Sequence, residues 1–328
     1  MTTTALAPLV APSLPSIRSG ATLREQIGPF LGWLAAIRGR RPNTILSYGR
    51  DLRAFVGFAA AAGIVRPADI SFNHLEAYFG YRQHHEGKKA TTINRARYAL
   101  ATFFQFLRRQ GLVTQNPVQD TFALPRPTRI PKYLSIATQE RVLAGLAARP
   151  SLAGRRDYAM IAVALFCGLR VSELASARVS DLNLEAGLLT IVGKGDKQRE
   201  CVVVPRLRVI LEDYLARTRP ALAGQRYGSP YLFTRSTRRS VAGKSPGPIL
   251  TRSIHWILKH HVSRLAEQPV FPHMLRHSFA SRLRENGAPL ELIQEALGHA
   301  NIATTLIYAH LSTSRQRADI AKYLKGGA

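Results

Sequence analysis

This sequence of 328 residues has few cysteines, no long apolar stretch and no pattern of a signal peptide. It has two cysteines, Cys167 and Cys201, whereas small secreted domains usually carry several disulfides. The longest apolar stretch, residues 158–169, is far shorter than the roughly 20 residues that span a bilayer. No basic residue precedes Arg18, and prolines interrupt the apolar residues near the N-terminus, so a signal peptide is not indicated. We therefore expect a cytoplasmic protein without membrane contact.

Acidic residues are also scarce. The chain has 20 Asp and Glu against 46 Lys and Arg, and its formal net charge is +26. Because such an excess repels itself, a polyanion is the expected partner, and nucleic acid fits best because neutralised phosphates release counterions. An anionic membrane surface is the weaker alternative, since no juxtamembrane helix concentrates the charge. Basic residues between positions 88 and 97 suit phosphate binding, although a charged helix face is usually only solvated.

Four amphipathic helices are predicted over residues 21–112, which we interpret as a small all-α domain. Thr22 and Glu25 match a capping box at the start of the first helix. Residues 1–20 are rich in Ala, Pro, Ser and Thr and predict a flexible tail. Prolines punctuate residues 113–132, which predict an interdomain linker.

The second domain is predicted to span residues 133–328 and to be mostly helical. The pattern predicts a helix after Ser135, a buried helix over residues 156–166, β-rich runs at residues 188–192 and 200–204, and helices from residue 207 onward, interrupted by a basic loop at residues 234–248. The two β-rich runs flank a Gly-Lys-Gly-Asp turn signal, so we expect an antiparallel hairpin. The fold class is mainly α, of the α+β kind, with one small antiparallel sheet.

Several residues of the second domain suit chemistry at a phosphate. Arg170 follows an apolar helix, where pairing with Glu173 three residues on would make it merely structural. His273, Arg276 and His277 share one helix face by their spacing. Zinc binding by the two histidines is disfavoured, because the arginine would repel a cation and the HExxH pattern is absent.

Three further residues are ambiguous when each is taken alone. Lys194 lies in the hairpin turn, where a lysine is ordinarily solvated. His299 follows a glycine at a predicted helix end, where a structural cap is the default interpretation. Tyr308 is one of 11 tyrosines, which are more often core residues than catalysts. Only the combination of these residues, in this order, is specific.

Together the segments resemble the tyrosine recombinase, or phage integrase, family, which includes phage-type integrases and Xer-like recombinases. The motifs match as follows: GLRxSEL at Arg170, GKGxKxR at Lys194, HxLRHxFA at His273 and Arg276, LGHxxIxTT at His299, and the nucleophile at Tyr308. The resemblance covers about residues 21–325, since the first domain is similar to the SAM-like core-binding domain of the family. Ser281 stands where many members have threonine, which affects no catalytic position.

The resemblance implies that Tyr308 attacks a DNA phosphate. A tyrosine ester keeps the energy of the phosphodiester bond until a DNA hydroxyl displaces it, which water attack would not do. The implied product is a 3′-phosphotyrosine with a free 5′-hydroxyl. Arg170 and Arg276 would bind the non-bridging oxygens with planar forks of donors, and Glu173 would orient Arg170.

The resemblance also assigns roles to the remaining site residues. His273 would accept the tyrosine proton, His299 would add a hydrogen bond to the phosphate, and Lys194 would protonate the departing 5′-oxygen. No cofactor and no metal are expected, because the arginines would replace a cation. In agreement, the sequence contains no acidic cluster of the two-metal kind and no GxxxxGK[ST] loop.

The expected partner is double-stranded DNA with specific recombination sites, bound by a homo-tetramer on two synapsed sites. The assembly could also require a second recombinase or an accessory protein. Residues 314–324 predict a short amphipathic helix, which would dock either on a neighbouring protomer or on its own domain. Strand exchange would pass through a four-way junction and serve integration, excision or transposition of a mobile element. Xer-like resolution of chromosome or plasmid dimers is the alternative. The expected location is the cytoplasm, at the nucleoid.

Three other functions are alternatives. A topoisomerase-like enzyme would use the same nicking chemistry without exchanging partners, and sequence-specific recombination would argue against it. A DNA-binding protein without recombinase activity predicts loss of a catalytic residue, yet all six are present. A metal-dependent nuclease would be excluded by activity in a chelator.

Overall fold

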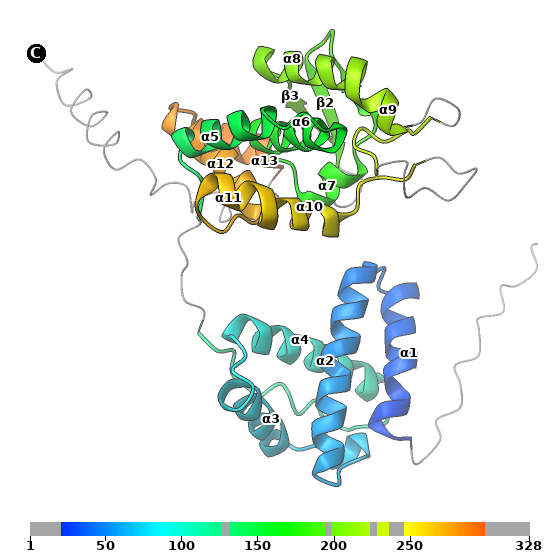
Figure 1. Cartoon of the computed structure of the whole chain (residues 1–328). Coiled ribbons are helices and arrows are strands. Elements are labelled where there is room, and N and C mark those ends of the chain that lie inside the picture. The colour runs from blue at the N-terminus through cyan, green and yellow to red at the C-terminus, as the bar shows by residue number, and fades with distance from the viewer. Residues whose placement is uncertain (1–20, 126–131, 194–197, 224–227, 236–245, 299–328) are drawn as a thin grey trace, which may run out of the picture. The chain divides into compact units, whose positions relative to one another are not determined.

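The chain divides after Thr128 into two compact units. The computed structural model describes residues 21–125, 132–193, 198–223, 228–235 and 246–298, whose helices and strands are drawn in Figure 1. Among these residues no helix is long and apolar enough to cross a membrane.

The described part of the first unit is a bundle of α-helices. The elements are α1 (Leu23–Ala36), α2 (Pro42–Ala61), a 3₁₀ turn (Pro67–Asp69), α3 (Phe72–His84) and α4 (Ala90–Arg109). The predicted capping box is present, because the N–H of Glu25 donates to Thr22 Oγ1 (3.3 Å) and the N–H of Thr22 donates to the Glu25 carboxylate (2.8 Å). The apolar faces meet in an aromatic core, where Phe30 packs edge-on against Phe103 with centroids 5.2 Å apart.

The segment after α4 packs on the first unit. We expected a linker over residues 113–132, but Val113 belongs to the core of this unit. The side-chain amide of Asn94 donates to the carbonyl of Leu124 and accepts from its N–H, both at 2.8 Å. Prolines end regular structure here, yet side chains of α4 satisfy the backbone groups and hold the segment in place. Residues 126–131 lie outside the described part of the chain.

Two of the basic residues considered for phosphate binding have partners inside the first unit. Arg95 forms a two-pronged ion pair with the buried Asp51, at 2.8 and 2.9 Å. Arg97 donates from Nε to the hydroxyl (2.8 Å) and the carbonyl (3.0 Å) of Thr121. Both guanidiniums therefore stabilise the bundle, although a planar guanidinium has further donors for a phosphate.

The second unit is built around a buried helix. Its helical elements are α5 (Ile136–Ala147), α6 (Leu152–Cys167), α7 (Val171–Ser176), a 3₁₀ turn (Val179–Asp181), α8 (Pro205–Asp213), a π turn (Tyr214–Thr218), α9 (Arg219–Ala223), α10 (Thr251–Ile257), a π turn (Leu258–Val262), α11 (Ser263–Ala266), α12 (Pro272–Glu285) and α13 (Leu290–Leu297). α6 is apolar around most of its circumference because α5, α8 and α12 all pack against it (Figure 1).

A three-stranded antiparallel sheet lies in the same unit. Its strands are β1 (Leu182–Asn183), β2 (Leu188–Val192) and β3 (Gln198–Val202), in the order β1-β2-β3. The predicted hairpin is confirmed, with Leu189 opposite Cys201 and Ile191 opposite Arg199. The second strand of the hairpin, β3, begins two residues earlier than the predicted β-rich run at residues 200–204. Strand β1 was not predicted, because a strand of two residues is too short to show an alternation of apolar and polar side chains. The mainly α fold with one small antiparallel sheet is confirmed.

Candidate active site

The site begins at the sharp corner between α6 and α7. Gly168 ends α6 with φ +61°, a conformation that favours glycine. A Cβ at this position would overlap the ring of Phe279 on α12. The glycine therefore permits both the turn and the close approach of α12. As a result, Arg170 becomes the residue that caps the N-terminus of α7.

Glu173 holds Arg170 in place. Its carboxylate accepts the backbone N–H of Arg170 (2.9 Å) and the Nη1 of the same residue (2.7 Å). Burial alone would raise the pKa of Glu173, but hydrogen bonds from Arg199 and Arg170 outweigh it and lower the pKa to about 2. The carboxylate is therefore ionised at any physiological pH. The Arg170 side chain remains 38% exposed, so part of its guanidinium can still meet a ligand.

Arg276 joins the α6–α7 corner to the end of α13. It lies on α12 and is 5% exposed. Nη1 donates to the carbonyl of Gly168 (2.7 Å), and Nη2 donates to the carbonyl of Leu297. A buried guanidinium with carbonyl partners is rigid. The two candidate arginines are thus attached to the same corner, Arg170 by sequence and Arg276 by a hydrogen bond.

The histidines of α12 differ in their surroundings. His273 lies in the first turn and is exposed, so its ring is accessible to a proton donor. His277, one turn later, is half-buried, and burial together with the positive charges of His273 and Arg276 lowers its pKa to about 4. The predicted common face of these residues is present, since all three lie on one regular helix. Groups of residues that could hold a metal ion are absent from the described residues.

Three of the six predicted site residues lie outside the described residues: Lys194, His299 and Tyr308. The described chain nevertheless reaches the neighbours of two of them. β2 ends at Val192, next to the turn that contains Lys194. α13 ends at Leu297, and Gly298 caps it with φ +59° directly before His299. The predicted helix at residues 314–324 also falls outside this part.

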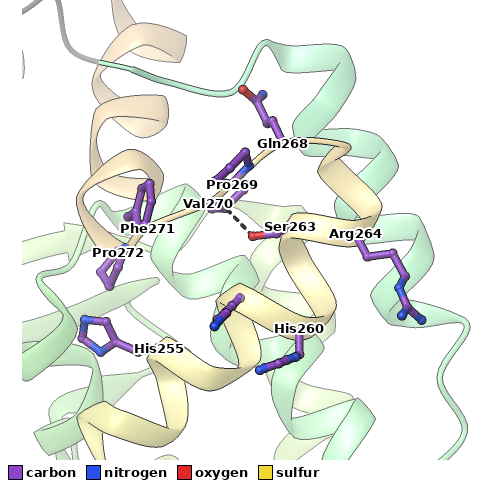
Figure 2. Close-up of a pocket in the computed structure, with 10 residues that line it drawn as sticks. His255, His260, Ser263, Arg264, Gln268, Pro269, Val270, Phe271 and Pro272 are labelled. Carbon is purple, nitrogen blue, oxygen red and sulfur yellow. Dashed lines mark hydrogen bonds between the residues drawn. The ribbon is translucent and has the colours of Figure 1, made fainter.

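A pocket of about 680 Å³ opens next to the start of α12. Figure 2 shows it between the helical segment that contains His255 and His260 and the stretch that leads into Pro272. The N–H of Val270 donates to Ser263 Oγ (2.8 Å) and fastens that stretch to the helix. Its basic lining residues are His255, Lys259, His260 and Arg264, and none of the residues that line it in the described structure is acidic. Lys259 and Arg264 therefore give this pocket a positive charge.

Beside this pocket, the helix from α10 to α11 exposes a basic and aromatic face. Trp256 is 54% exposed, and its ring centroid lies 4.8 Å from that of His260. The opposite face, with Ile257 and Val262, is buried. A π turn interrupts this helix at Leu258–Val262, and such turns are frequent at functional sites. We did not predict this face, although exposed residues at helical spacing gave a detectable signal.

Comparison with known proteins decides the family. The "Phage integrase family" model matches residues 137–315, and the "Phage integrase, N-terminal SAM-like domain" model matches residues 27–111. The chain belongs to the phage integrase family. Tyrosine recombinase XerD of Listeria monocytogenes serotype 4b (strain F2365) is 34% identical over 296 residues, which cover 89% of this chain and 96% of the relative. Tyrosine recombinase XerC of Herpetosiphon aurantiacus is 34% identical over 295 residues, with 89% and 92% covered. This member of the phage integrase family is therefore a site-specific tyrosine recombinase.

Solved structures show the same fold at lower identity. The XerH site-specific recombinase bound to a palindromic difH substrate, in a post-cleavage complex, has a TM-score of 0.72 and 20% identity, with 92% of this chain and 96% of that chain covered. The Tn1549 transposon integrase in complex with a circular intermediate DNA has a TM-score of 0.72 and 19% identity, with 92% and 99% covered. The recombinase fold thus extends over both units of the chain.

Proposed function

We propose that this recombinase cuts DNA with Tyr308 as the nucleophile and rejoins it after strand exchange through a four-way junction. The observation that carries the proposal is the pair of arginines at the α6–α7 corner, Arg170 and Arg276. Their separate anchors leave one guanidinium rigid and the other partly exposed. Two fixed positive charges stabilise the charge that develops on phosphate oxygens in the transition state.

The remaining steps use groups of this chain only. His273, exposed at the start of α12, takes the phenol proton of Tyr308 as the tyrosine attacks phosphorus. The bond to the 5′-oxygen breaks, and Lys194 supplies the proton that this oxygen needs. His299 adds a hydrogen bond to the phosphate. Rejoining reverses these proton transfers, when a 5′-hydroxyl of the partner strand displaces the tyrosine.

DNA is the substrate that the charge of the chain supports. Lys259, His260 and Arg264 line a pocket whose wall also includes Pro272, the residue before His273. A DNA phosphate bound in this pocket would therefore lie close to the phosphate that reacts. The exposed Trp256 beside it offers an apolar contact for base edges. Several solved structures with the same fold are complexes with DNA, which supports this proposal.

We further propose a homo-tetramer on two synapsed sites, with integration, excision or transposition of a mobile element as the biological role. An assembly that includes a partner recombinase or an accessory protein is the alternative. Resolution of chromosome or plasmid dimers is a second candidate role, favoured by the 34% identity to enzymes named XerD and XerC. We propose core binding for the first unit, with residues 113–125 added to the expected 21–112, and catalysis for residues 133–328.

The test is covalent trapping without metal. DNA duplexes that bind the protein are first selected from a randomised pool, and a few nicks are then introduced into them. When the enzyme cleaves near a nick, a short fragment diffuses away. Rejoining is then impossible, and the enzyme stays covalently attached. The wild type in EDTA is expected to form an adduct that survives SDS, and Tyr308→Phe is expected to form none. Tyr98→Phe, at an exposed tyrosine of the first unit, is the control and should behave as the wild type. An equal adduct from Tyr308→Phe would contradict the proposal.

A further inference from the structure

Arg199 joins three elements that are far apart in the sequence. It lies on β3, opposite Ile191, and its side chain is 12% exposed. Nη2 donates to the carboxylate of Glu173 on α7 at 2.9 Å. On another side, a Cβ placed on Gly298 would lie 3.0 Å from its Cδ. The side chain is therefore wedged between the N-terminal turn of α7 and the end of α13.

These contacts complete a closed path around the site. Glu173 binds Arg170 on one side and Arg199 on the other. Gly298 directly follows Leu297, whose carbonyl accepts from Arg276. We call this path the arginine circuit; it runs through Arg170, Glu173, Arg199, Leu297–Gly298, Arg276 and Gly168. Both candidate catalytic arginines are members, and among the described residues Arg199 connects the Arg170–Glu173 pair to the end of α13, where Arg276 is bound.

We infer that Arg199 is a positioning residue for DNA cleavage, which orients Arg170 through Glu173 and holds the end of α13 against the site. The inference rests on the proposed function, since it assigns to Arg199 a part in that reaction. Arg199 is not a catalytic residue in this proposal, because its Nη2 binds Glu173 and its side chain is only 12% exposed.

The chemistry of the side chain explains why an arginine is needed. Glu173 spans two guanidiniums, and its two oxygens are divided between them. Without Arg199, the second carboxylate oxygen keeps only the backbone N–H of Arg170, so the carboxylate that orients the Arg170 guanidinium is held less firmly. A lysine keeps the positive charge, but it lacks the planar fork and fills less of the space against Gly298. Arg199→Lys should therefore restore part of the function.

A purely structural role is the alternative, and the chain contains a matched control for it. Arg156 forms a buried ion pair with Asp157 at 2.8 Å, with side chains 11% and 3% exposed. The Arg199–Glu173 pair has a distance of 2.9 Å and side chains 12% and 6% exposed. Arg156 lies near the start of α6 and Gly168 lies just after its end, roughly 18 Å apart along the axis. Loss of either arginine should lower the melting temperature, but only loss of Arg199 should alter the site.

The experiment compares Arg199→Ala, Arg199→Lys, Arg156→Ala and the full-length wild type on the nicked duplexes used for covalent trapping. The rate constant of adduct formation is measured at saturating DNA, below the melting temperature of every variant. We expect Arg199→Ala to lose roughly 10- to 100-fold, as for other residues that orient a catalytic group. Arg199→Lys should be intermediate, and Arg156→Ala should stay within about twofold of the wild type.

A pH profile provides a readout that a stability defect does not imitate. Without Arg199, the pKa of the buried Glu173 rises, because burial is then opposed by Arg170 alone. In Arg199→Ala, Glu173 is then protonated at mildly acid pH and releases Arg170. As pH is lowered, the rate of adduct formation should therefore begin to fall at a higher pH in Arg199→Ala than in the wild type. Adding Glu173→Gln to Arg199→Ala should remove this acid limb.

The outcomes are distinct. A slower Arg199→Ala with the shifted acid limb, beside a normal Arg156→Ala, supports the inference. Equal rate constants and equal pH profiles for Arg199→Ala and Arg156→Ala overturn it and leave the proposed function standing. If the wild type itself forms no adduct, the proposed function is contradicted and the role of Arg199 falls with it.

Discussion

Replacement of Glu173 by glutamine tests the electrostatics of the site. In the folded chain the pKa of this carboxyl is about 2, compared with an ordinary value of 4.5. A difference of about 2.5 units corresponds to about 3 kcal/mol of stability at neutral pH. Because the folded-state pKa is the lower one, this stabilisation is complete well above pH 4.5 and is lost as pH falls toward 2. Glu173→Gln should therefore lower the free energy of unfolding by about 3 kcal/mol at pH 7, and less than half of the difference should remain at pH 3.

Two tryptophans make the measurement specific to the second unit. Trp33 packs on the core of the first unit, and Trp256 lies in the second. In a Trp33→Phe background, the fluorescence of Trp256 reports urea unfolding of the second unit. Glu185→Gln, at an exposed glutamate before β2, is the control and should change the stability by less than about 0.5 kcal/mol.

Either of two results would refute the electrostatic argument. If Glu173→Gln costs less than about 1 kcal/mol at pH 7, or costs the same at pH 3 as at pH 7, the carboxylate is not held by its two arginines as the structure has it.

Three further predictions concern neighbouring residues. Because burial and the adjacent positive charges lower the pKa of His277 to about 4, its ring should stay neutral in an NMR titration down to pH 5, and a normal pKa near 6.5 would contradict this. As pH falls below 6.5 the unfolded state alone takes up this proton, so His277 should lower stability toward acid pH. Gly168→Ala places a Cβ on a residue with a left-handed backbone and against the ring of Phe279, so it should lower the free energy of unfolding in urea by about 2–4 kcal/mol. Gly28→Ala is the control and should not lower it, because a Cβ there meets nothing within 4 Å. Lys259→Ala should weaken DNA binding for all sequences, and it should reduce the slope of log K against log salt concentration by about 1. An unchanged slope would show that the pocket does not contact DNA.

Features that depend on near neighbours in the sequence could be predicted. The capping box at Thr22 needs only a glutamate three residues on, and the structure has it. The pairing of Arg170 with Glu173 likewise follows from their spacing, and so does the shared helix of His273 and Arg276. The turn signal between two β-rich runs predicted the hairpin correctly. In each case the deciding interaction lies within one element or one turn.

Features that depend on tertiary contacts could not be predicted. Arg199 appeared in the sequence only as part of a motif, because its partners Glu173 and Gly298 come from other elements. The extent of the linker was misjudged for the same reason, since the side chain of Asn94 on α4 binds the later segment at Leu124. Prolines report that a segment is not helical, but they do not report whether it packs. The roles of all six site residues stay predictions, and for Lys194, His299 and Tyr308 so do their positions.

The most direct test of the central claim is to identify the amino acid that carries the DNA. The covalent adduct is digested with nuclease and protease, and the peptide that retains a nucleotide is sequenced by tandem mass spectrometry. We predict a nucleotide joined through its 3′-phosphate to Tyr308, in a reaction that proceeds in EDTA. A nucleotide on any other residue, or one joined through its 5′-phosphate, would contradict it.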